Sequence, residues 1–243
     1  MKLYIAALSL FILMISPSSQ AQESDYINAN FNDIAKTYWR IGYHTLDDKT
    51  AIDEFTRINY CSAYQTYQND DFEWQYIRQA IAEEIKQDKD SYPNKYYITS
   101  KITINKYDFD QNAFLLEEDS QMLNVGKLTL LPYSDFKSYC DLSRYSESYP
   151  NMVSITLEAP ITISSIPLER EEANQLLSRF NATKNNERIL YAKINLNING
   201  FGETYHSALQ SVANLKGNLH SIEYYEDPDF TKLVHTFVPI KML

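Results

Sequence analysis

The stretch Arg188-Ile-Leu-Tyr-Ala-Lys-Ile-Asn-Leu-Asn-Ile198 decides the fold class of this chain. Apolar and polar residues alternate along it, a period of two that is typical of a half-buried β-strand. The positions that share one face are Leu190, Ala192, Ile194, Leu196 and Ile198. Asn199-Gly200 follows directly, and this pair favours a tight hairpin turn. The stretch therefore predicts a strand that ends in a hairpin.

The same alternation marks further strands on both sides of this stretch. Between Tyr96 and Tyr107, the residues Tyr96, Ile98, Ile102 and Ile104 share one face. Residues 108–112 read as a turn, and residues 113–116 as the returning partner strand. Strands are also predicted over residues 127–131, 152–163, 219–225 and 233–240, whereas residues 203–215 are ambiguous between strand and helix.

Helical periodicity is concentrated near the start of the chain. Three helices are predicted there, over about residues 27–42, 50–67 and 70–88. The third shows the clearest pattern, because Asp70 or Asp71 can cap it and Trp74, Ile77, Ile81 and Ile85 form a stripe. A fourth helix is predicted to begin at Pro167, since proline suits the first turn, and to end near Phe180.

These elements predict an α+β fold, with N-terminal helices followed by a mostly antiparallel sheet and one further helix. The helical part spans about residues 27–90 and the sheet-rich part about residues 95–243. The chain contains only five glycines and no linker rich in Pro, Gly or Ser. We therefore expect residues 22–243 to form a single domain.

The first 21 residues read as a secretory signal peptide. Lys2 is followed by an apolar run to Ile15, then by Pro17 and a small residue, Ala21, at the cleavage point. The apolar run is shorter than the roughly 20 residues that span a bilayer, although an uncleaved anchor is the alternative. We therefore expect an exported chain, periplasmic or secreted, with no transmembrane anchor in its mature part.

The charge balance of the chain is acidic. Its formal net charge is −10 at pH 7, and it contains no run of Lys or Arg. Nucleic-acid binding depends on neutralising phosphates, and binding to an anionic membrane surface also needs basic residues. We expect no nucleic-acid partner.

Two cysteines, Cys61 and Cys140, remain after cleavage of the signal peptide. An oxidising compartment favours their pairing in a disulfide, with two buried free thiols as the alternative. No nucleophile motif surrounds either residue, which argues against a catalytic thiol.

One segment has the spacing of a calcium-binding loop. Asp108, Asp110, Asn112 and Asp119 occupy positions 1, 3, 5 and 12 of that pattern, and their oxygen atoms could surround a hard cation. Position 6 is Ala113 rather than glycine, and the flanking residues read as strands rather than helices. The pattern therefore favours an acidic hairpin turn over a metal site.

No other catalytic or cofactor motif is present in the sequence. The four histidines form none of the zinc-binding pairs, and there is no nucleophile elbow, dinucleotide fingerprint or phosphate-binding loop. We expect no cofactor, no metal and no catalytic residue. The 20 tyrosines fit either a sheet core or a surface that binds other molecules.

Three segments resemble those of a family of exported bacterial proteins that has no assigned function. They are Ile58-Asn59-Tyr60-Cys61, Asn69-Asp70-Asp71-Phe72-Glu73-Trp74 and Lys106-Tyr107-Asp108-Phe109. The resemblance implies a bacterial envelope setting but no activity, cofactor or site residue.

Three functional hypotheses follow. The first is a non-enzymatic accessory or assembly factor that binds a protein partner in the cell envelope. The second is a small-ligand or glycan-binding module that uses Tyr38, Trp39 and Tyr43, or residues 133–149, as a stacking surface. The third is a hydrolase with an unrecognised site.

Overall fold

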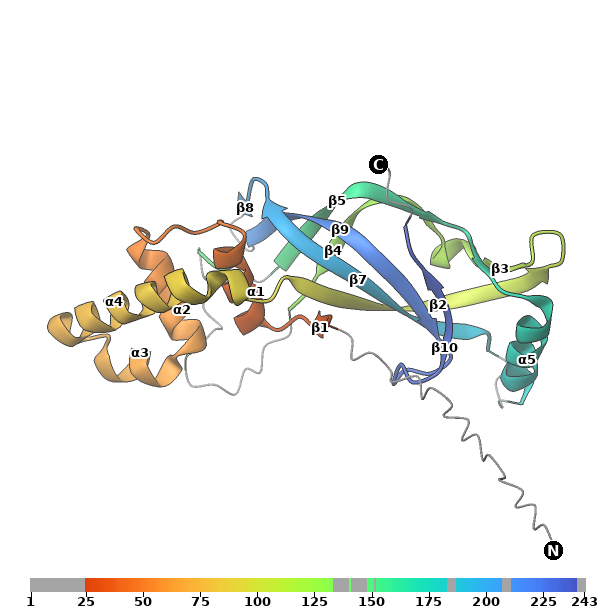
Figure 1. The fold of residues 1–243 in the computed structure, drawn as a ribbon, viewed down its shortest axis with the longest axis horizontal. Helices are drawn as coiled ribbons and strands as arrows, with labels where there is room; N and C mark the ends of the chain where they lie inside the picture. The colour runs from red at the N-terminus through yellow and green to blue at the C-terminus, as the bar shows by residue number, and fades with distance from the viewer. Residues whose placement is uncertain are drawn as a thin grey trace, which may run out of the picture.

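The computed structural model describes residues 25–132, 140, 148–150, 152–182, 187–206 and 211–239. The predicted signal peptide lies outside these residues. The α-helices are α1 (Phe31–Arg40), α2 (Lys49–Asn59), α3 (Cys61–Tyr67), α4 (Asp71–Asp88) and α5 (Arg170–Asn181). Figure 1 shows α1–α4 gathered at one end of the molecule and α5 at the opposite end of the sheet.

The strands of the described residues form one long, curled sheet (Figure 1). They are β1 (Ile27–Asn28), β2 (Lys95–Asp108), β3 (Ala113–Leu116), β4 (Met122–Leu130), β5 (Met152–Ile163), β6 (Ser165–Pro167), β7 (Ile189–Phe201), β8 (Tyr205–His206), β9 (Ser211–Tyr225) and β10 (Leu233–Phe237). The main strand order is β4-β5-β9-β7-β2-β3-β6. Most neighbours are antiparallel, and the parallel pairs are β1 with β2 and β5 with β9. The predicted α+β class is confirmed.

The central strand β7 shows the alternation that its sequence predicts. The five apolar residues of the predicted face are all buried in the core, and β7 is paired with β2 on one side and β9 on the other. Helix α1 is attached to this sheet through Thr37, whose Oγ1 lies 2.6 Å from the hydroxyl oxygen of the buried Tyr96. The core therefore contains side chains from both the helices and the sheet.

The prediction of a hairpin turn at Asn199-Gly200 is wrong. Strand β7 continues through these residues to Phe201, because Gly200 lies opposite Lys216 and Phe201 lies opposite Leu215 in β9. The register shifts between Ile198 and Gly200, so the glycine marks an irregularity inside a strand pair.

The start of the α5 helix also differs from the prediction. Pro167 ends β6, where it lies opposite Ala113 of β3, and the helix begins three residues later at Arg170. The pairing of Ile166 with Phe114 buries both side chains and holds this segment extended.

The N-terminal helices follow the predicted stripes, with two corrections to their bounds. Residues 27 and 28 form β1 rather than the first helical turn, and Asn30 caps α1 by accepting a hydrogen bond from the backbone N–H of Asp33. The second predicted helix is two helices, because Tyr60 leaves helical geometry between α2 and α3. Helix α4 begins as predicted, with the Asp70 side chain accepting hydrogen bonds from Phe72 and Glu73. None of the helices in the described ranges is both long and apolar enough to cross a membrane.

Candidate functional site

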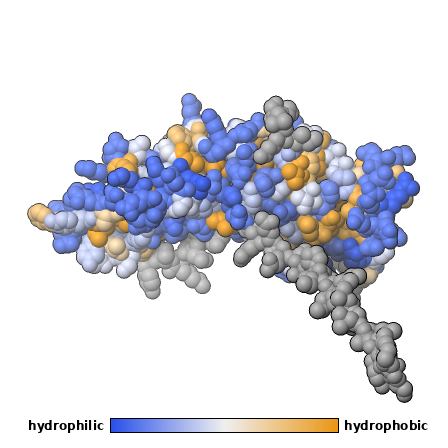
Figure 2. All heavy atoms as spheres, viewed as in Figure 1, coloured by the Kyte–Doolittle hydropathy of each residue, from blue (hydrophilic) through white to orange (hydrophobic). Residues whose placement is uncertain are grey.

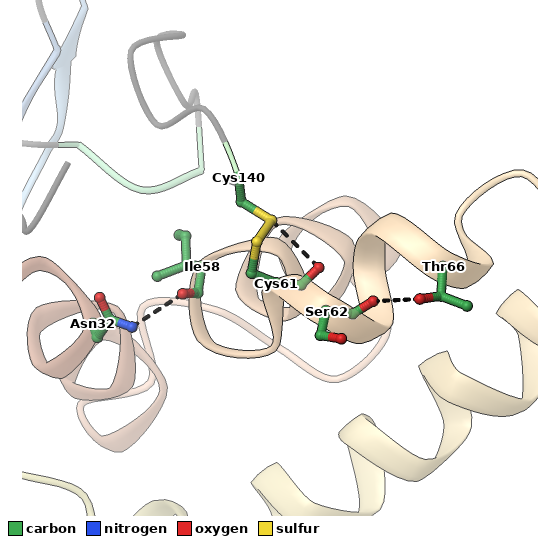
Figure 3. Close-up of a disulfide and its surroundings, with 6 residues drawn as sticks. All are labelled: Asn32, Ile58, Cys61, Ser62, Thr66 and Cys140. Carbon is green, nitrogen blue, oxygen red and sulfur yellow. Dashed lines mark hydrogen bonds between the residues drawn. A yellow bond between two sulfur atoms is a disulfide. The ribbon is translucent and has the colours of Figure 1, made fainter. Parts of the chain in front are cut away.

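The two cysteines form a disulfide (Figure 3). Their Cα atoms are 5.6 Å apart, and Cys61 is the first residue of α3 while Cys140 lies between β4 and β5. Nearby, the side chain of Asn32 donates a hydrogen bond to the carbonyl oxygen of Ile58 at 3.0 Å, which joins α1 to the end of α2. The disulfide therefore ties the connection between the neighbouring antiparallel strands β4 and β5 to the helical end of the molecule.

The segment with calcium-loop spacing forms a turn in which the Asp108 carboxylate is bonded to backbone N–H groups. Asp108 Oδ1 accepts hydrogen bonds from the backbone N–H groups of Asp110 and Gln111, at 2.8 and 3.0 Å. Asn112 Oδ1 accepts a hydrogen bond from the guanidinium of Arg170, which places a positive charge where a cation would have to bind.

The fourth residue of that spacing lies apart from this turn in the chain. Asp119 belongs to a short 3-10 helix, Glu118–Ser120, beyond strand β3. Within the described ranges there is no group of three His, Cys, Asp or Glu side chains that could hold a metal ion.

The aromatic residues predicted to stack on a glycan are part of the core. Tyr38 and Trp39 are buried, and Tyr43 is half-buried. The Tyr38 hydroxyl donates to the carbonyl oxygen of Pro150, and Trp39 Nε1 donates to the Tyr149 hydroxyl at 2.9 Å. These rings therefore form no open stacking surface, while residues 133–139 and 141–147 of the second proposed surface lie outside the described residues.

His44 is enclosed by the same aromatic group. The rings of Tyr38, Trp39, Tyr43 and Tyr149 have their centroids 4.7–6.0 Å from that of His44. Burial lowers the pKa of His44 to about 4, despite the opposing effect of Asp48 and of a hydrogen bond with the backbone of Ser148. His44 is therefore neutral at pH 7 and packs as an aromatic residue of the core.

The most unusual surface feature is a group of exposed aromatic side chains that the sequence analysis missed. Phe72 and Tyr76 of α4 are 82% and 68% exposed, and Tyr67 at the end of α3 is 38% exposed. We call these three residues the aromatic tip. Figure 2 shows hydrophobic spheres at the outer end of the helical part, where α4 begins.

The sequence did contain a signal for this surface. In a helix, Phe72 and Tyr76 are four residues apart and share a face, and successive residues turn by about 100°. Trp74, Ile77, Ile81 and Ile85 form the stripe that packs inward, which places both aromatic residues on the opposite side of the helix. Large exposed apolar side chains that gather in one place are typical of protein interaction sites.

Helix α4 is held firmly against α2 on its inner side. Arg78 forms two hydrogen bonds with Asp53 of α2, Nε to Oδ1 at 2.7 Å and Nη2 to Oδ2 at 2.6 Å. Trp74 Nε1 donates to the same carboxylate at 3.2 Å. Phe72 and Tyr76 of the aromatic tip therefore project from a helix whose opposite side is fixed to α2.

Two cavities that share lining residues offer a second, more polar candidate. Strand β2 has a bulge at Asn105 and Lys106, where its register with β3 slips. Cavities of about 530 and 460 Å³ are both lined by Asn105 and Glu117, and one also includes Glu118 and the other Glu187. Amide and carboxylate oxygens of this kind can bind the hydroxyl or amino groups of a small molecule.

Comparison with known proteins gives one match. Residues 47–179 match the model of a protein family described as "Domain of unknown function (DUF4852)". The matched region contains the aromatic tip, both cysteines and the three segments whose resemblance to a family without assigned function was noted in the sequence. No curated protein and no solved structure matches the chain.

Proposed function

The chain belongs to the DUF4852 family, whose function is unknown, and from this premise we propose that it is a non-enzymatic accessory protein that binds another protein through its aromatic tip. The observation that carries the proposal is the exposure of Phe72 and Tyr76 on one face of α4. Leaving two large aromatic side chains in water is unfavourable, and covering them with a partner removes that cost. Aromatic residues are also enriched at the centres of protein interfaces.

The proposal includes export to a cell envelope. It is supported by the signal-like residues 1–21 and by the disulfide, because disulfides persist mainly in oxidising compartments. The resemblance of the sequence to exported bacterial proteins points the same way.

Site-specific crosslinking in the cells that make the protein tests the proposal. A photoreactive phenylalanine analogue is placed at Phe72 or Tyr76, and Phe109 serves as the control because it is similarly exposed, at 65%, in the turn after β2. We expect one stoichiometric crosslinked protein from positions 72 and 76 and none from position 109. Equal crosslinking at all three positions, or none at position 72, would contradict the proposal.

The two cavities beside β2 favour a second function, the binding of a small polar ligand. Their volumes lie in the range of ligand-binding sites, and their linings are rich in hydrogen-bonding groups. The test is calorimetric titration with a panel of soluble oligosaccharides, comparing the wild type with Glu117→Gln. Heats that are the same in both proteins would argue against a site at this position.

A further inference from the structure

We propose that the partner segment that covers the aromatic tip is cationic, with Arg or Lys side chains placed on the exposed rings. This inference rests on the proposed function and specifies the chemistry of the partner. It follows from two separate features of the tip within the described part of the chain, its carboxylates without an ion pair and its aromatic rings without a cation.

The charged residues of the segment that contains the tip all have the same sign. Residues 61–77 contain Asp70, Asp71 and Glu73 but no Lys, Arg or His. All three acidic residues are exposed, and Asp70 caps α4. Within the described part of the chain, Asp71 and Glu73 have no ion pair.

The nearest basic residue along α4 does not neutralise this charge. Arg78 is paired with Asp53 on the inner side of the helix, and that pairing raises the pKa of the guanidinium. Lys86, more than two turns further along, pairs with Glu83. The tip therefore repels acidic partners and attracts basic ones, as complementary charge does across protein interfaces.

Several other aromatic side chains in the described part of the chain show the contact that the tip lacks. Lys193 Nζ lies 4.4 Å from the centre of the Tyr97 ring, and the Arg170 guanidinium lies 5.8 Å from the centre of the Phe109 ring. Lys95 lies in the same way over Tyr26. Across the described ranges, no Lys or Arg of this chain covers Tyr67, Phe72 or Tyr76 in this way.

The two features favour the same occupant. A Lys or Arg side chain gains from the aromatic face and from the carboxylates beside it, whereas a neutral apolar segment gains only from burial of the rings. Arginine fits best, because its planar guanidinium can stack on a ring and pair with a carboxylate.

The test uses the full mature protein and three labelled helical peptides of one apolar pattern, whose polar positions are all Arg, all Gln or all Glu. Binding is followed by fluorescence anisotropy at low and high salt. We expect the Arg peptide to bind more tightly than the Gln peptide by about tenfold at low salt, with the difference shrinking as salt rises. The Glu peptide is expected not to bind.

Three variants locate the effect. Phe72→Ser combined with Tyr76→Ser should abolish binding, and Asp71→Asn combined with Glu73→Gln should weaken binding of the Arg peptide about three- to tenfold. The matched control is Glu171→Gln combined with Glu172→Gln, which removes two exposed first-turn carboxylates from α5 at the other end of the sheet. The control should leave binding unchanged.

The inference is overturned if the Arg peptide does not bind, if the Arg and Gln peptides bind equally, or if the α5 control weakens binding as much as the α4 variant. Crosslinking from position 72 separates the two proposals. If it persists undiminished in the Asp71→Asn, Glu73→Gln protein, the tip binds a protein but the charge inference is wrong. If there is no crosslink at position 72 in the wild type, protein binding through the tip is itself contradicted.

Discussion

Gly217 of β9 lies so close to Asn197 of β7 that a Cβ atom on the glycine would be 2.6 Å from the asparagine carbonyl oxygen. The same atom would be 3.2 Å from Cγ2 of Ile155 in β5. Gly217 is the point where β9 pairs with Leu157 on one side and Ile198 on the other. The approach of three strands at this point therefore depends on a residue without a side chain.

The substitution Gly217→Ala is expected to destabilise the protein by about 1–3 kcal/mol, because the added methyl group overlaps backbone atoms that cannot move independently. Gly126→Ala is the control, since a Cβ atom there would meet nothing within 4 Å. That variant should change the free energy of unfolding by less than about 0.5 kcal/mol. Urea denaturation measures both, and equal stability of the two variants would contradict the close packing at Gly217.

Loss of the disulfide is expected to lower stability by about 3–5 kcal/mol, because the bond closes a loop between residues 79 apart and restricts the unfolded chain. The double variant Cys61→Ala, Cys140→Ala is compared with the wild type by urea denaturation, with and without a reductant. The reductant should destabilise the wild type and leave the variant unchanged. An unchanged wild type under reducing conditions would contradict the prediction.

Tyr149→Phe is expected to cost about 2–4 kcal/mol. The Tyr149 hydroxyl accepts a hydrogen bond from Trp39 Nε1 and donates one to the carbonyl oxygen of Ala51, so its removal leaves two buried polar groups without this partner. The matched control is Tyr224→Phe, because the buried Tyr224 hydroxyl has no partner in the described ranges. Thermal unfolding should show that Tyr224→Phe is at least as stable as the wild type and that Tyr149→Phe is less stable. If Tyr149→Phe is as stable as Tyr224→Phe, the assignment of the Tyr149 hydrogen bonds is wrong.

Acid is expected to destabilise the protein through His44. Its folded-state pKa of about 4 lies below the ordinary histidine value of 6.5, so below pH 6.5 the unfolded state binds a proton that the folded state does not. The free energy of unfolding therefore carries no penalty from His44 above pH 6.5. It falls as the pH is lowered toward 4, by about 3 kcal/mol at pH 4.

The variant His44→Phe should remove this part of the pH dependence while keeping an aromatic ring in place. Burial also lowers the pKa of His235, so a smaller dependence of the same sign should remain. The measurement is the free energy of unfolding between pH 4 and pH 7.5, and parallel profiles for wild type and His44→Phe would refute the assignment.

Local patterns predicted the elements whose faces differ most in polarity. The alternation in β7 and β2 and the stripe of α4 are all found at the predicted positions, because one face of each is more deeply buried than the other. Strand β5 has the predicted bounds, Met152–Ile163. Predictions failed at Asn199-Gly200 and at Pro167, where a distant strand supplies the pairing that overrides the local turn or helix preference.

The aromatic residues of the candidate site also depend on contacts that a local pattern does not predict. Exposed and buried aromatic residues look alike in the sequence, so the hypothesis of a glycan-binding module could place Tyr38 and Trp39 on a stacking surface, whereas they are found in the core. No hypothesis drawn from the sequence placed Phe72 or Tyr76 at a site. Both are far more exposed than Tyr38 and Trp39.

By itself, the sequence determined the α+β class, the acidic charge and the cysteines available for pairing, since composition and periodicity are properties of the chain alone. Only the tertiary structure decided which strands pair, that Cys61 meets Cys140, and which aromatic side chains remain in water. The physical reason is that these features depend on contacts between residues far apart in the chain. A local pattern fixes which face of an element is apolar, but not which other element will cover it.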